Sequence, residues 1–218
     1  MDLSYIVLII LSWILITFLL INWIMIFNRT DSKKFSFFTF FPFELNPYRR
    51  QTKQGKFSLF LLSLLTLLMI VPIILFAISF NYVSSYVMMS FFIIAFCSFL
   101  ALLFIKLSNY YKHLIFVSIF VTVEFTLLLL MFFYFSNKNY GYSILTTKSI
   151  ICIVLLIIQM IFEFILIFNP NYKNWAKMVK MDAEIFSRPK YCYLAMLEWG
   201  TFLNLILNYI PISIILLF

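Results

Sequence analysis

Long blocks of apolar residues, joined by shorter polar segments, make up almost the whole of this chain. A helix of about 20 apolar residues crosses the hydrocarbon core of a bilayer, so each block predicts one membrane span. Six spans are expected, near residues 4–27, 57–80, 87–107, 114–135, 150–168 and 196–218. The predicted fold class is an all-α integral membrane protein with six transmembrane helices.

Basic residues test this number of spans independently. With six spans, the loops 28–56, 106–113 and 169–195 lie on one side of the membrane and hold fourteen of the sixteen Lys and Arg residues. The other side holds Lys138 and Lys148. Because positive loops mark the cytoplasmic or matrix side, both termini are predicted to lie on the same, non-matrix side.

Residues 170–186, between the last two predicted spans, have a different pattern. On a helix, apolar side chains of this segment share one side and its lysines share the other, which predicts an amphipathic helix on the matrix-side surface. The chain therefore divides into three parts. Residues 1–86 form an N-terminal two-helix extension, residues 87–170 a three-helix core, and residues 171–218 the amphipathic segment with the sixth span.

Composition excludes a soluble protein and gives no sign of a cofactor. Hydrophobic residues make up 65% of the chain and the mean hydropathy is +1.06, whereas soluble domains are roughly 45–50% apolar. No nucleotide-binding or nucleophile motif is present. The single His113 and the isolated Cys97, Cys152 and Cys192 lack metal-ligand spacing, and the cysteines are predicted to be small core residues. We expect no metal and no cofactor in this chain. The net charge of +8 follows the loops, so no nucleic-acid partner is expected.

Amino-acid usage indicates where the chain is made. The 29 Phe and three Gly suggest an AT-rich genome, for which an organellar genome is the obvious candidate. The first span begins directly after Met1 and Asp2, so we expect a retained helix rather than a cleaved signal or presequence. Few small residues also mean that the helices have few close-packing stripes. Neighbouring subunits and lipid, including cardiolipin at the basic matrix loops, are expected to cover them.

Two glutamates lie where a carboxylate is costly. Glu124 is in the middle of the fourth predicted span and Glu163 is inside the fifth. Intramembrane acids are rare and mark proton or ion pathways by default. A carboxyl group that can hold or release a proton is what a proton relay requires, so Glu124 and Glu163 are the candidate proton-transfer residues. The alternative is that both are protonated and only pack the helices.

Other polar or helix-breaking residues lie in or near the predicted spans. Gln159, one turn before Glu163, is placed to share a hydrogen bond with it. Lys106 and Lys112 are expected to orient the chain, and Lys106 could instead be a counter-ion for an acid. Pro72 predicts a kink in the second span. Glu198 is expected to be solvated at the membrane interface.

The sixth predicted span has a polar stripe of its own. Thr201, Asn204, Asn208 and Pro211 recur on one face of a helix. Hydrogen bonding between helices is the favoured interpretation. A water-lined pathway is the alternative.

Residues 87–170 resemble chain 4L of the proton-pumping NADH:ubiquinone oxidoreductase, respiratory complex I. That family is a three-helix subunit with one Glu in its second helix, another in its third, and a short basic matrix loop between the first two helices. Here Lys106-LSNYYKHL-Ile115 is similar to the loop, VEFTLLLLMFF contains Glu124, and QMIFEFILIF contains Glu163. The resemblance implies that these carboxyl groups take part in proton translocation coupled to quinone reduction.

The resemblance also implies partners and location. A chain of this family is a non-catalytic subunit that assembles with other membrane-arm subunits in the mitochondrial inner membrane. A structural accessory subunit of a respiratory complex or ATP synthase is the rival interpretation, with the acids only packing helices. A small carrier or channel is disfavoured, because no internal repeat or broken helix pair is visible.

Overall fold

The chain is described from a computed structural model that covers residues 52–80, 83–105, 109–136, 147–170 and 192–208, with residues 10, 14, 17, 18 and 42 besides. Within these ranges the structure is helical and contains no strand. The predicted span 4–27 and the predicted amphipathic helix at 170–186 lie almost entirely outside the described residues. Six spans and the sides of the termini are therefore not decided by the described part.

The first part of the bundle is a broken helix. Thr52 caps α3 (Lys53–Leu68), because its Oγ1 accepts a hydrogen bond from the Gly55 N–H at 3.0 Å. After Met69 the chain continues as α4 (Ile70–Phe80). Residue 72 is a proline, which has no N–H to bond the carbonyl of Leu68 four residues earlier. The regular helix is interrupted at Met69, three residues before this proline, and the predicted kink stays a prediction.

Two long helices form the centre of the bundle. They are α5 (Val83–Phe104) and α6 (Tyr110–Ser136), and they pack along each other's length, with α4 on the other side of α5. Phe92, Phe96 and Phe99 from α5 and Phe120 and Leu127 from α6 are almost fully buried between them. Because the chain has few small residues, the contact between α5 and α6 is made by large side chains, mainly phenylalanine.

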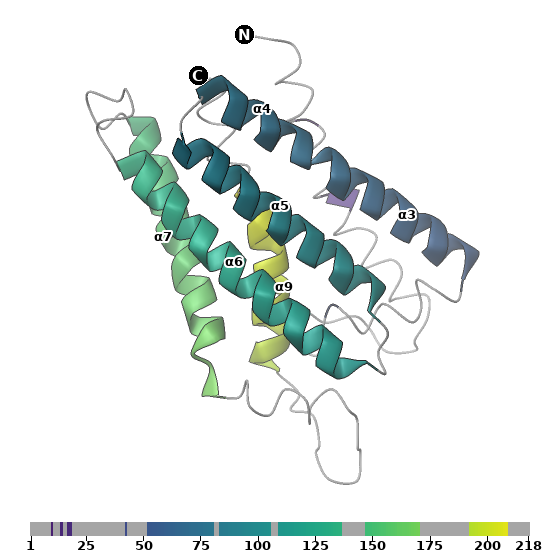
Figure 1. The fold of residues 1–218 in the computed structure, drawn as a ribbon. Coiled ribbons are helices and arrows are strands. Elements are labelled where there is room, and N and C mark those ends of the chain that lie inside the picture. The colour runs from purple at the N-terminus through teal and green to yellow at the C-terminus, as the bar shows by residue number, and fades with distance from the viewer. Residues whose placement is uncertain are drawn as a thin grey trace.

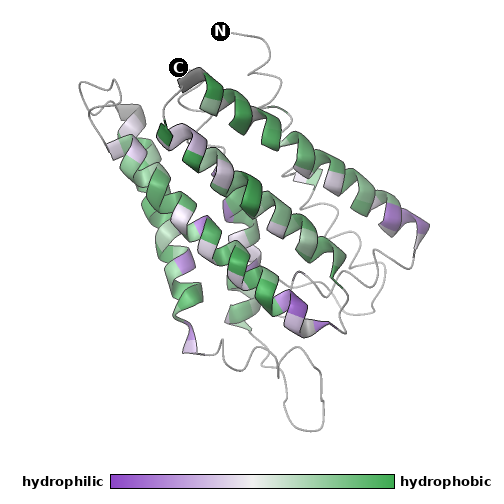
Figure 2. Ribbon diagram, viewed as in Figure 1, coloured by the Kyte–Doolittle hydropathy of each residue, from purple (hydrophilic) through white to green (hydrophobic). Residues whose placement is uncertain are grey.

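Helices α7 (Thr147–Ile167) and α9 (Tyr193–Leu207) complete the described part. Helix α7 packs on α6, and α9 packs on α7 and more weakly on α5. Helices α3, α6 and α9 begin at the end of the bundle where α5 and α7 finish, the lower end in Figure 1. Figure 2 shows apolar residues along the helices and hydrophilic residues where α3 and α6 begin. The order α3–α4, α5, α6, α7, α9 therefore alternates in direction.

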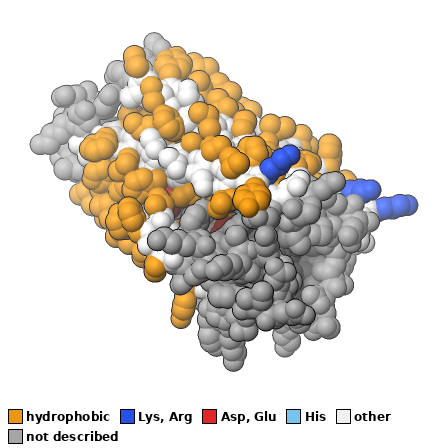
Figure 3. All heavy atoms as spheres, turned by 60° about the horizontal axis from the view of Figure 1, so that its bottom comes forward, with side chains coloured by type: hydrophobic (Ala, Val, Ile, Leu, Met, Phe, Trp, Pro, Cys, Tyr) orange, Lys and Arg blue, Asp and Glu red, His pale blue; other side chains and the backbone are white. Residues whose placement is uncertain are grey.

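Four helical segments are long and apolar enough to cross a membrane, and they match the second to fifth predicted spans. They run Lys53–Leu75, Val83–Phe104, Tyr111–Ser136 and Ser149–Ile167. Helix α9, in the sixth predicted span, has 15 residues in its described part. Large apolar side chains remain exposed, among them Phe57, Phe133 and Ile158, and apolar groups cover much of the surface in Figure 3. Such a surface suits lipid or other apolar chains, so the described part is that of a helical membrane protein.

Candidate functional site

Glu124 and Glu163 meet in the interior of the bundle. Glu124 comes from the middle of α6 and Glu163 from the second half of α7, and both are 0% exposed. The two carboxyl groups lie close enough to interact with each other, and both oxygens of Glu124 are buried without a hydrogen-bond partner among the described residues. A hydrogen bond between the two groups would need one proton, because an ionised carboxylate can only accept. We refer to these two residues as the carboxyl pair, and the sequence predicted both as candidates.

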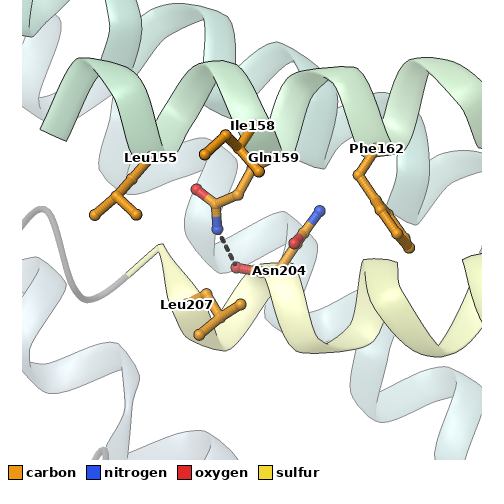
Figure 4. Close-up of a pocket in the computed structure, with 6 residues that line it drawn as sticks. All are labelled: Leu155, Ile158, Gln159, Phe162, Asn204 and Leu207. Atoms are coloured by element: carbon orange, nitrogen blue, oxygen red, sulfur yellow. Dashed lines mark hydrogen bonds between the residues drawn. The ribbon is translucent and has the colours of Figure 1, made fainter. Parts of the chain in front are cut away.

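An uncharged amide side chain of α9 contacts the carboxyl pair. The Asn204 side-chain Nδ2 donates to Glu163 Oε1 at 3.5 Å. Gln159 Nε2 donates to the backbone oxygen of Asn204, also at 3.5 Å, as Figure 4 shows. Both bonds are long and therefore weak. Gln159 was predicted to bond Glu163; instead, its side chain reaches across to α9, because the helices are close enough there for an amide to span the gap.

A hollow lies beside this contact, between α7 and α9. Its volume is about 180 Å³, and Leu155, Ile158, Gln159, Phe162, Asn204 and Leu207 line it (Figure 4). The hollow is partly open to the surface of the bundle, and most of its lining is apolar. Gln159 Oε1 is buried without a hydrogen-bond partner among the described residues. The hollow thus places this amide oxygen beside the Asn204 that contacts Glu163.

A second buried pair joins α6 and α9. His113 Nε2 and Glu198 Oε1 are 3.1 Å apart, and the two residues are 0% and 3% exposed. The prediction that Glu198 is solvated at the interface is wrong: its side chain is buried, and the imidazole of His113 takes the place of water. We refer to these residues as the His–Glu pair. Sequence reasoning missed it, although the predicted topology placed the only histidine and this glutamate near the same membrane face.

Three phenylalanines lie between the two pairs along the helices. On α6, Phe120 falls between His113 and Glu124 on the same helical face. Phe202 follows Glu198 by one turn on α9. The ring centroids of Phe120 and Phe202 are 5.3 Å apart, and Phe99 of α5 lies 5.3 Å from Phe202. All three side chains are at most 4% exposed. This aromatic cluster separates the two polar sites with apolar material.

The contact between α7 and α9 depends on one glycine. A Cβ atom added at Gly200 would lie 2.0 Å from Phe162 Cε1, far inside van der Waals contact. The absence of a side chain at Gly200 therefore lets the Phe162 ring lie against the α9 backbone. This close approach holds α9 near enough for Asn204 to reach Glu163.

The remaining predicted site residues do not join the carboxyl pair. Lys112 is exposed at the start of α6, and the twelve residues to Glu124 rise roughly 18 Å along the helix. Lys106 and Pro211 lie outside the described residues. Asn208 is 0% exposed, and its side-chain amide has no partner in the described part of the chain. Thr201 does not bond another helix, because its hydroxyl donates to the Glu198 carbonyl within α9 at 2.8 Å.

Metal chemistry has no support in the residues described. No group of three His, Cys, Asp or Glu residues there is arranged to hold a metal ion. Cys152 and Cys192 are buried as predicted for small core residues, whereas Cys97 is exposed on α5. The polar chemistry in the described ranges is thus that of carboxyl, imidazole and amide groups.

Comparisons of the chain with known protein families, with curated proteins and with solved structures find no match.

Proposed function

We propose that this chain is a subunit of a proton-translocating membrane assembly, in which Glu124 and Glu163 hold and pass a proton. The observation that supports the proposal is the meeting of two buried carboxyl groups from neighbouring membrane-spanning helices. Pairs of this kind are rare inside membranes because each charge is costly there. In its specific form the proposal is a membrane-arm subunit of proton-pumping NADH:ubiquinone oxidoreductase, similar to chain 4L.

The proposal includes a placement in the mitochondrial inner membrane. Six spans would put the basic loops on the matrix side and both termini on the other, with other membrane-arm subunits and lipid around the chain. Lys53, Lys56 and Lys112 lie near the starts of α3 and α6, at one end of the bundle, which agrees with that orientation. A tag at either terminus that proves to be on the matrix side would refute the six-span arrangement.

The carboxyl pair can exchange protons without leaving its place. With one proton on the pair, either carboxyl group can carry it. A second proton neutralises the pair, and its departure leaves one carboxyl group ionised. Asn204 Nδ2 donates to the oxygen that bears the charge when Glu163 is ionised. The chain itself then carries protons, and the redox chemistry belongs to its partners.

The test is Glu124→Gln in the native membrane assembly. Glutamine keeps the size and the hydrogen-bonding capacity of the side chain but cannot exchange a proton at neutral pH. We expect assembly to be retained and proton pumping per assembled complex to fall at least about tenfold, because a positioned proton-transfer group typically contributes about 10²–10⁴-fold. Thr66→Val is the matched control, because it removes a buried polar group that bonds only its own helix. Undiminished pumping by an assembled Glu124→Gln variant would leave the accessory structural role instead.

A structural role is the second candidate, and one observation favours it. The contacts from Glu124 to Glu163 and from Glu163 to Asn204 tie α6, α7 and α9 together. If this is their whole purpose, Glu124→Gln is silent, whereas Glu124→Ala lowers assembly. Pumping per assembled complex separates the two functions.

A further inference from the structure

The His–Glu pair is the second group of buried titratable side chains in the described structure, and the proposed function does not yet use it. His113 lies in the first turn of α6, directly after the exposed Lys112 and near the exposed Asn109. Water at that end of the bundle therefore reaches the residues that adjoin His113. Its Nε2 is bonded to Glu198 on another helix, so the pair bridges α6 and α9.

The His–Glu pair and the carboxyl pair lie at different depths on the same helices. Glu124 follows His113 by eleven residues on α6, a rise of roughly 16 Å. On α9, Asn204 follows Glu198 by six residues, a rise of roughly 9 Å. Both helices begin at the end where the basic residues of α3 lie. The His–Glu pair is therefore nearer the basic face, and the carboxyl pair is deeper.

The aromatic cluster fills the region between these depths. Apolar constrictions stop ions and protons because they exclude water until they open. Phe120 and Phe202 come from the same two helices as the His–Glu pair, and their rings are in contact. On the far side of the carboxyl pair from the His–Glu pair, Gln159 and Leu155 line the hollow between α7 and α9. The order along the bundle is basic end, His–Glu pair, aromatic cluster, carboxyl pair, hollow.

We infer that the His–Glu pair is a second proton-exchange site, which takes protons from the basic membrane face and supplies the carboxyl pair across the aromatic cluster. This inference rests on the proposed function. It states that the protons reach the carboxyl pair from the basic membrane face, and it gives a role to α9.

Each transfer moves one proton and no electrons. A proton from water binds His113 Nδ1, and the imidazolium that forms donates its Nε2 proton to Glu198 Oε1 across the 3.1 Å contact. The imidazole is neutral again with its proton on Nδ1, and Glu198 is a carboxylic acid; before the next transfer the ring must turn over or move this proton back to Nε2 through water. When the aromatic cluster admits water, Glu198 passes the proton to the ionised member of the carboxyl pair and returns to a carboxylate. Histidine suits this role because its two nitrogens can take up and release a proton on opposite sides of the ring.

The experiment compares two double variants in the native membrane assembly. In His113→Gln with Glu198→Gln, the two amides can still hydrogen-bond but cannot exchange protons. In His113→Glu with Glu198→His, the two exchanging groups are retained in swapped positions. Pumping per assembled complex is measured for both, with Glu124→Gln as the reference for the carboxyl pair.

We expect the Gln–Gln variant to assemble and to lose pumping about tenfold, and the swapped variant to recover at least half of the wild-type rate. A Gln–Gln variant that pumps at the wild-type rate overturns the inference, and so does a swapped variant that assembles without pumping. If total pumping in both variants falls only as far as the amount of assembled complex falls, the inference is also overturned, because the pair is then only structural. If Glu124→Gln abolishes pumping while the Gln–Gln variant does not, the inference fails and the proposed function stands. If Glu124→Gln is silent, the proposed function fails.

Discussion

The two halves of the bundle differ in the kinds of polar side chain that form hydrogen bonds. In α3 and α5, hydroxyl groups donate back to their own helix: Ser63 to Leu59, Thr66 to Leu62 and Ser90 to Tyr86, each to the carbonyl four residues earlier. The hydroxyl groups of Thr126 in α6 and Thr201 in α9 also bond their own helix, but carboxyl, imidazole and amide side chains of α6, α7 and α9 bond across helices. A hydroxyl satisfied within its own helix places no demand on its neighbours.

Carboxyl, imidazole and amide groups are different because their own helix cannot satisfy them. Glu163 needs Glu124 and Asn204, and His113 needs Glu198, so these residues determine which helices meet and at what depth. They are also groups that can exchange protons, except for the amide. The α3–α5 half is therefore predicted to tolerate loss of polarity, whereas the α6–α7–α9 half is not.

The largest expected effect comes from removing both acids of the carboxyl pair. Glu124→Gln combined with Glu163→Gln should pump no worse than the weaker of the two single variants, because both groups act in one path and their effects are not additive. Pumping and assembly of all three variants give the measurement. If the fold-loss of pumping in the double variant equals the product of the two single fold-losses, the two glutamates act independently and are not one site.

Gly200→Ala should give the next largest effect and acts on packing alone. Its Cβ would lie 2.0 Å from Phe162 Cε1, so the ring must turn aside or α9 must move away. We expect a loss of about 1–3 kcal/mol in the stability of the assembled protein, the usual cost of overpacking. Thermal denaturation in detergent measures it. Adding Phe162→Ala should recover part of the loss, and no recovery would mean that the close approach is not the cause.

Asn204→Leu should have a moderate effect. It removes the side-chain bond to Glu163 but leaves the backbone oxygen that accepts from Gln159. Hydrogen bonds between membrane helices are worth about 0.6–2 kcal/mol, and this one is long, so the lower part of that range is expected. The same denaturation assay applies, and a cost larger than that of Gly200→Ala would contradict the expected order of the two effects.

Thr66→Val should have the smallest effect, although Thr66 is 0% exposed. Its hydroxyl bonds only the Leu62 carbonyl, which the helix can satisfy without it, and valine has nearly the same shape. Less than about 0.6 kcal/mol is expected. A larger cost would mean that this half of the bundle also depends on its polar groups, which would remove the contrast between the halves.

Apolar length alone locates the second to fifth predicted spans within a few residues of the observed helices. The cost of burying an acid makes Glu124 and Glu163 stand out in the sequence alone. Their meeting is also expected from adjacent spans. The interruption at Met69 lies three residues before the proline at residue 72.

The hydrophobic pattern does not show which residues far apart in the sequence are partners. Glu198 was predicted to be an interfacial acid because the sequence places it near the end of a span. Nothing in the pattern identifies His113, 85 positions away, as its partner. Gln159 was predicted to bond Glu163 on its own helix, but the approach of α9 at Gly200 offers it a backbone oxygen instead. Both differences arise from the packing of α9, whose position depends on one glycine.

The central claim, that Glu124 and Glu163 share an exchangeable proton inside the bundle, is tested most directly by infrared difference spectroscopy on the assembled protein. The C=O stretching band of a protonated carboxyl group should be present at neutral pH and should shift when water is replaced by D₂O. It should be lost or displaced in both Glu124→Gln and Glu163→Gln and unchanged in Thr66→Val. A carboxyl spectrum that neither glutamate substitution alters would contradict the account.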